Sequence, residues 1–145
     1  MYRHILIATD GSELAEHAVT SGLSLAKSLG AKVTVIIVES DVSAWSLAEH
    51  GAFREIATIT EQIKNNAASV LNRAANAAKQ ADVSCDTIQM EDAQPYQAII
   101  ATAADRGCDL IVMASHGRSG LSAVVLGSVT NKVLTHTKIP VLVVR

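Results

Sequence analysis

The sequence of 145 residues is poor in cysteine and in aromatic side chains. Its two cysteines, Cys85 and Cys108, form neither a C-x-x-C pair nor a zinc-type cluster with histidine, so we expect buried apolar side chains. With one Phe, one Trp and two Tyr, the chain also lacks a platform on which single-stranded nucleic acid could stack. These shortages argue against a disulfide-stapled scaffold, a structural zinc site and an aromatic nucleic-acid binder.

Concentrated charge and long apolar runs are also missing. Twelve basic and fourteen acidic residues give a net charge of −2, and the basic residues are scattered, whereas duplex binding needs a basic face. No apolar run approaches the ~18 residues of a membrane span. The apolar start is interrupted by Asp10, too soon for a signal peptide. We therefore expect a cytoplasmic protein that binds neither nucleic acid nor a membrane.

The apolar residues, 49% of the chain, fall into five short runs separated by helical patterns. The runs are rich in Val and Ile and predict strands at residues 4–8, 32–38, 83–90, 109–114 and 141–144. Apolar residues at helical spacing predict helices at residues 13–29, about 52–81, roughly 95–106 and 128–136. The third run alternates polar and apolar residues, as an edge strand does. The pattern predicts one α/β domain over residues 1–145 with a parallel sheet, but leaves the strand order open.

Signals at the helix ends support these assignments. Ser12 is a favourable N-cap, Gly30 a favourable C-cap, and Pro95 suits the first turn of its helix. Residues 40–51 are the least regular part, and we expect a loop or the frayed start of a helix there, with Trp45 anchoring the segment rather than covering the site. The longest helix carries an apolar stripe that we assign to the core: Ile56, Ile59, Ile63, Ala67, Val70, Leu71 and Ala74.

Three of the eight glycines, Gly117, Gly120 and Gly127, fall in the stretch ASHGRSGLSAVVLGS after the fourth strand. Loops at the carboxyl ends of parallel strands gather at one edge of the sheet, where ligands bind. If the fourth strand lies beside the first, this stretch faces Asp10. Glycine there exposes backbone N–H groups, and a helix beginning at Ser128 adds the positive end of its dipole. The stretch therefore suits a phosphate, while Asp10 can accept hydrogen bonds from ribose hydroxyls.

Taken alone, this pattern leaves phosphate binding and an ordinary glycine-led helix start equally open. The chain has neither a G-x-x-x-x-G-K-[ST] loop nor a G-x-G-x-x-G after the first strand. A hydrolytic triad of Ser115, His116 and Asp10 is not expected, because ASHGR is not a G-x-S-x-G elbow and adjacent side chains on a strand end point opposite ways. We predict no catalytic residue and no metal site formed by protein alone; Mg²⁺ would arrive with ligand phosphates.

The segments ILIATDGS, KVTVIIVES and DLIVMASHGRSGLSAVVLGSVTNKVLTHTKIPVLVVR resemble the universal stress protein family, and the similarity covers essentially the whole chain. Nucleotide-binding members carry G-x2-G-x9-G-[ST] after the fourth strand. Gly117, nine further residues, Gly127 and Ser128 match all but the first position, which is Ala114. If the methyl group of Ala114 points at the ribose, binding weakens; if it points into the sheet, little changes.

The resemblance implies the strand order 3-2-1-4-5 of a Rossmann-like, adenine nucleotide alpha hydrolase-like fold. It also implies binding of ATP or AMP between the first and fourth strands. The positions that match the family place Ala8 and Thr9 beside the base, Asp10 at the ribose, Val38 at the adenine edge, Met113 and Ala114 near the sugar, and Gly117, Gly127, Ser128 and Val129 around the phosphates. From their own chemistry, we expect His116 to shape the loop or contact a phosphate, and Arg118 to add a positive charge at the outer end of the site.

The last strand supplies an argument about assembly. Its residues Val141, Leu142, Val143 and Val144 are all apolar, and an edge strand of this kind invites a second copy to pair with it. We therefore expect a homodimeric adenine-nucleotide-binding protein that acts with an unknown partner in stress response or regulation. The alternatives are a slow ATP-hydrolysing or nucleotidyl-transfer enzyme of the same fold, and a dimeric regulatory module that has lost nucleotide binding.

Overall fold

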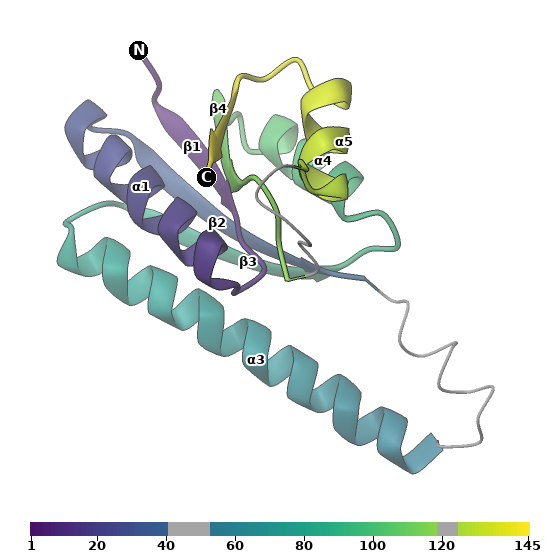
Figure 1. The fold of residues 1–145 in the computed structure, drawn as a ribbon. Helices are drawn as coiled ribbons and strands as arrows, with labels where there is room; N and C mark the ends of the chain where they lie inside the picture. The colour runs from purple at the N-terminus through teal and green to yellow at the C-terminus, as the bar shows by residue number, and fades with distance from the viewer. Residues whose placement is uncertain (41–52, 119–124) are drawn as a thin grey trace.

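Five strands and four helices alternate along the described chain, which comprises residues 1–40, 53–118 and 125–145 of a computed structural model (Figure 1). The expected loop around Trp45, and also Gly120, lie outside these residues. The elements are β1 (His4–Ala8), α1 (Glu13–Leu29), β2 (Lys32–Glu39), α3 (Phe53–Gln80), β3 (Cys85–Glu91), α4 (Pro95–Asp105), β4 (Leu110–Ala114), α5 (Ser128–His136) and β5 (Val141–Val144). None of the described helices is both long enough and apolar enough to span a bilayer.

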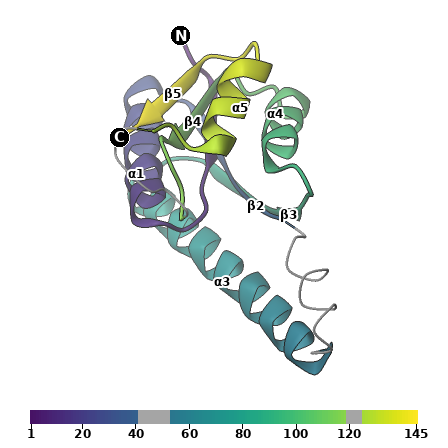
Figure 2. The same ribbon diagram turned by 45° about the vertical axis from the view of Figure 1, so that its right-hand side comes forward.

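The five strands form one parallel sheet in the order β3-β2-β1-β4-β5, which confirms the expected fold class. Ile7 of β1 lies between Val35 of β2 and Val112 of β4. Helices α1 and α3 cover one face of the sheet, and α4 and α5 cover the other (Figures 1 and 2). Because β1, β2 and β4 are sandwiched between two helical layers, their apolar residues can be consecutive, whereas β3 alternates at one edge.

The helix ends follow the signals in the sequence. The hydroxyl of Ser12 accepts a hydrogen bond from the Ala15 amide at 3.3 Å, and Gly30 closes α1 with a left-handed φ of 65°. Pro95 stands in the first turn of α4. The third strand begins at Cys85 rather than at residue 83, because Val83 still belongs to the turn that ends α3 and donates its amide to Ala78 O at 2.9 Å.

The apolar stripe of α3 enters the core over only part of its length. Ala67, Val70, Leu71 and Ala74 are buried against the sheet, as expected. The remaining residues of the stripe, Ile56, Ile59 and Ile63, are only half-buried and lie outside the core, so their assignment to it was wrong. The reason is geometric, since the first half of this 28-residue helix extends beyond the end of the sheet (Figures 1 and 2).

Both cysteines are free thiols. Cys108 is buried as expected, and burial raises the pKa of its thiol to about 11. Cys85, on the edge strand β3, is only half-buried, which corrects the expectation for this residue. Burial and the neighbouring Asp86 carboxylate raise its pKa as well. Neither thiol is therefore activated as a nucleophile at neutral pH.

Candidate functional site

A cavity of about 640 Å³ opens at the carboxyl ends of β1, β2 and β4, beside the first turns of α4 and α5. All twelve residues that sequence reasoning assigned to a ligand site line this one cavity: Ala8, Thr9, Asp10, Val38, Met113, Ala114, His116, Gly117, Arg118, Gly127, Ser128 and Val129. They come from four separate parts of the chain. The parallel sheet gathers them because the ends of its central strands meet at one edge.

The peptide groups of Val38 face the cavity because β2 extends beyond the end of β1. Residues of β2 alternate between their two neighbours: Lys32 and Ile36 bond to the chain of β1, whereas Val33 and Glu39 bond to the side of β3. Val38 therefore turns its N–H and C=O toward the β1 side. The pairing of β1 with β2 ends at Ile36, so these two groups lie beyond the last paired position. They present one donor and one acceptor side by side.

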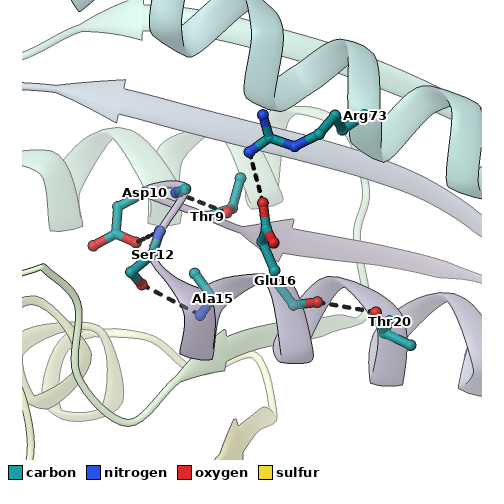
Figure 3. Close-up of polar contacts among 8 residues, drawn as sticks. Thr9, Asp10, Ser12, Ala15, Glu16, Thr20 and Arg73 are labelled. Atoms are coloured by element: carbon teal, nitrogen blue, oxygen red, sulfur yellow. Dashed lines mark hydrogen bonds and ion pairs between the residues drawn. The ribbon is translucent and has the colours of Figure 1, made fainter.

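Asp10 connects the two loops that border the cavity. Its Oδ1 accepts a hydrogen bond from the Ser12 amide at 2.9 Å, which closes a short turn before α1 (Figure 3). Its Oδ2 accepts one from the Arg118 amide, also at 2.9 Å, across the space between β1 and β4. A carboxylate has about four acceptor positions, so these two bonds leave it able to accept hydroxyl groups of a ligand.

Only glycine fits at position 117, because the backbone here lies against Asp10. A Cβ atom built at this position would overlap Asp10 Oδ2. Among the described glycines, positive φ angles occur at Gly11, Gly30 and Gly107 and not at Gly117. The backbone angle therefore does not require glycine at position 117, whereas the close approach to Asp10 does.

The role expected for the Gly127 amide also needs correction. This N–H donates to Ser115 O at 2.6 Å, so it is already used within the protein. The first intrahelical bond of α5 runs from the Asn131 amide to Gly127 O at 2.9 Å, which leaves the amides of Ser128 and Val129 at the open start of the helix. An anion at this end of the cavity would meet those two amides and the positive end of the helix dipole.

Ala114 directs its methyl group into the sheet. Its side chain packs with Leu110 and Val112 in the core beneath α1 and α3, whereas that of Met113 packs on the face covered by α4 and α5. The carbonyl of Ala114 accepts a hydrogen bond from the buried Thr130 hydroxyl at 2.7 Å, which ties β4 to the first turn of α5. Of the two orientations left open for this methyl group, the structure shows the one that points into the sheet.

Ser115 and His116 lie closer to each other than the strand pattern suggested. The Ser115 Oγ is 3.1 Å from His116 Nδ1, because β4 has ended at Ala114 and the backbone no longer alternates. The expectation that the two side chains point apart is therefore wrong. Asp10 nevertheless bonds to backbone amides, and no hydrogen bond among the described residues joins it to the imidazole. A Ser-His-Asp arrangement is not formed.

Acidic and basic side chains both lie near the rim of the cavity. Burial, and then the facing Glu91, raise the pKa of the Glu39 carboxyl at the end of β2. Lys64 and Arg118 act in the opposite direction on Glu39. The Arg118 guanidinium lies beside Gly11, since a Cβ built there would be 3.1 Å from its Nη2. In the described part of the chain, no group of three or more His, Cys, Asp or Glu residues is arranged to hold a metal ion.

Several lining residues were not found from the sequence. Ile36 had a usable signal, because it lies two residues before Val38 and on the same face of β2. Pro95 and Ile99 had none, since their contribution depends on how α4 docks on the sheet. The full set of lining residues missed is Ala15, Ile36, Pro95, Ile99, Val125, Leu126, Thr130 and Asn131.

A parallel sheet of order 3-2-1-4-5 with a cavity between β1 and β4 defines a Rossmann-like α/β domain. Residues 1–145 match the Universal stress protein family, and the chain belongs to this family. It is 33% identical over 149 residues to universal stress protein YxiE of Bacillus subtilis, with all of both chains covered.

One solved structure with the same fold is that of MJ0577. The protein of that name from Methanocaldococcus jannaschii is a universal stress protein. This structure is 30% identical, covers 99% of this chain and 96% of its own, and has a TM-score of 0.73. A universal stress protein solved in complex with cAMP has a TM-score of 0.69 at 23% identity, covering 99% of this chain and 97% of its own. At that identity the likeness concerns the fold.

Proposed function

We propose that this protein binds an adenine nucleotide, ATP or AMP, in the cavity between β1 and β4, and that it acts in stress response or regulation in the cytoplasm. One observation carries the proposal: the paired donor and acceptor of Val38, the Asp10 carboxylate and the open start of α5 all border one cavity of about 640 Å³. Cavities of about 300–1,000 Å³ are typical of small-molecule sites.

Each part of a nucleotide has a matching surface. The base fits between the apolar side chains of Ile36 and Ile99, with the peptide groups of Val38 at its hydrogen-bonding edge. The ribose hydroxyls donate to Asp10, and the phosphates meet the amides of Ser128 and Val129. Ala8, Thr9 and Met113 form the floor, and a bound Mg²⁺ would be held by the phosphates themselves. A universal stress protein of the same fold was solved in complex with cAMP, which supports an adenine nucleotide as the class of ligand.

We propose a binding role rather than an enzymatic one. Asp10 is the only carboxylate among the described residues that line the cavity, and in the proposed arrangement its remaining acceptor positions meet the ribose hydroxyls rather than the phosphates. A general base for water or hydroxyl attack needs a free acceptor close to the nucleophile. Slow hydrolysis of ATP would therefore be incidental to binding.

We also propose that the protein is a homodimer joined through β5. This strand is the last in the sheet, and its Leu142 is 40% exposed although it is apolar. The other edge, β3, carries Asp86, Gln89 and Glu91, which discourage pairing. Two copies of β5 that pair about a two-fold axis would satisfy the open edge and cover its apolar side chains.

Thermal unfolding with and without Mg-ATP tests the binding proposal. Nucleotide at 100 times its dissociation constant should stabilise the fold by about 2.7 kcal/mol and raise the midpoint by several degrees. An unchanged midpoint at millimolar Mg-ATP and at millimolar AMP would contradict it. Phosphate release from the same sample separates binder from enzyme, since turnover of about 1 s⁻¹ or faster would favour the enzymatic alternative.

A further inference from the structure

The Asp10 carboxylate is held by two backbone amides from distant parts of the chain. The Ser12 amide donates to Oδ1 and the Arg118 amide donates to Oδ2, each at 2.9 Å. The first bond belongs to the local turn before α1, whereas the second joins residues 108 positions apart. The orientation of the carboxylate therefore depends on where the loop after β4 lies.

Gly117 allows that loop to come so close. A Cβ atom at this position would overlap Asp10 Oδ2 and lie 3.2 Å from Asp10 Cγ. Real Cβ atoms do not approach a carboxylate oxygen so closely, so either Asp10 or the loop would have to move. The φ angle at Gly117 is not positive. Alanine is therefore compatible with the backbone here, and its effect reports on the contact with Asp10.

We propose that Gly117 and the Arg118 amide are positioning groups for Asp10, and that through Asp10 they select the sugar of the ligand rather than its phosphates. The proposal rests on the proposed function, because it takes Asp10 to meet the ribose. A carboxylate fixed by two amides keeps acceptor positions for the two neighbouring ribose hydroxyls. Hydrogen bonds to a charged acceptor are among the stronger ones, so loss of this orientation should remove discrimination between sugars.

Calorimetric titration with ATP and with 2′,3′-dideoxy-ATP tests this selection. The unmodified protein should bind ATP roughly tenfold or more tightly than the dideoxy nucleotide. Gly117→Ala should lower the affinity for ATP to that for dideoxy-ATP and leave the latter within about twofold. Ser128→Ala, a matched change at the start of α5, should alter both affinities equally and keep their ratio. A Gly117→Ala protein that retains the ratio, or that loses affinity for both nucleotides in the same proportion, overturns the proposal.

A measurement without nucleotide separates this proposal from the function on which it rests. The amide of Arg118 should exchange its hydrogen slowly in the unmodified protein, and as fast in Gly117→Ala as in Asp10→Ala. If the unmodified protein binds neither nucleotide, the proposed function fails, while loss of slow exchange in Gly117→Ala still supports the positioning of Asp10. An equal exchange rate at Arg118 in the unmodified protein and in Gly117→Ala overturns that positioning.

Discussion

The backbone of Gly127 packs against the loop that follows β4, and a Cβ atom there would lie 3.0 Å from His116 Cα and 3.1 Å from Ser115 O. Gly117 faces Asp10 in the same tight manner, and the methyl group of Ala114 packs beneath α1 and α3. At the scale of the residue, each of these three small residues is thus in close contact with a different part of the protein. Their small size sets the shape of the cavity in the absence of a ligand.

Substitution of Gly127 by alanine should destabilise the protein even without nucleotide. The new methyl group would press on backbone atoms that cannot rotate away, and overpacking of this kind costs about 1–3 kcal/mol. Chemical denaturation of Gly127→Ala and of the neighbouring Ser128→Ala measures the effect, with only the first expected to lose stability. Equal stabilities of the two variants would show that the loop adjusts freely.

His4 should make stability depend on pH. Its imidazole is buried, with Nε2 2.8 Å from the Thr34 hydroxyl and Nδ1 3.1 Å from Arg106 O. Burial, followed by the Lys32 charge, lowers its pKa below the ordinary 6.5. The folded protein then binds fewer protons than the unfolded chain, so the free energy of unfolding should fall as the pH drops below about 6.5 and toward the lowered folded pKa.

Denaturation series at several pH values test this dependence. His4→Gln should flatten the slope below pH 6.5, whereas the exposed His17→Gln should retain it. A slope that survives in His4→Gln would assign the titration to another group.

At the scale of the element, sequence patterns predicted most of the helices and strands. Runs of Val and Ile predicted the strands because strands covered on both faces need no alternation, and Ser12 and Gly30 marked the ends of α1. The strand order came from family resemblance, since pairing of strands far apart in sequence leaves no local trace. For the same reason the Asp10–Arg118 bond could not be predicted. The half-buried start of α3 could not either, because helical periodicity does not show where the sheet ends.

Two truncations in α3 should differ in their effect on stability. Leu71→Ala removes a buried side chain from the core and should lower the free energy of unfolding by about 2–5 kcal/mol. Ile59→Ala removes a half-buried one from the part that extends beyond the sheet, and should cost less than about half as much. Urea denaturation of both variants checks this order. A loss for Ile59→Ala as large as that for Leu71→Ala would mean that the first half of α3 is as well packed as the second.

At the scale of the whole molecule, the sheet has two unlike edges. The apolar edge β5 lies next to β4, close to the cavity, while the polar edge β3 lies on the far side of β2. Because two copies of β5 related by a two-fold axis run antiparallel, a homodimer of this kind would place its two cavities at opposite edges of the joined sheet.

A charge placed on β5 should dissociate the homodimer. Leu142→Glu puts a carboxylate on the exposed apolar position of this edge, and light scattering at micromolar concentration should report a monomer. Thr87→Glu makes the same change on the exposed edge strand β3 and should remain dimeric. Dissociation by Thr87→Glu alone, or a monomeric unmodified protein, would contradict assembly through β5.

The most direct test of the account is a crystal structure of the protein grown with ATP and Mg²⁺. We expect the nucleotide in the cavity between β1 and β4, with adenine at the peptide groups of Val38, ribose at Asp10 and phosphates at the amides of Ser128 and Val129. A structure in which the nucleotide binds elsewhere, or in which this cavity stays empty at saturating ATP, would contradict the central claim.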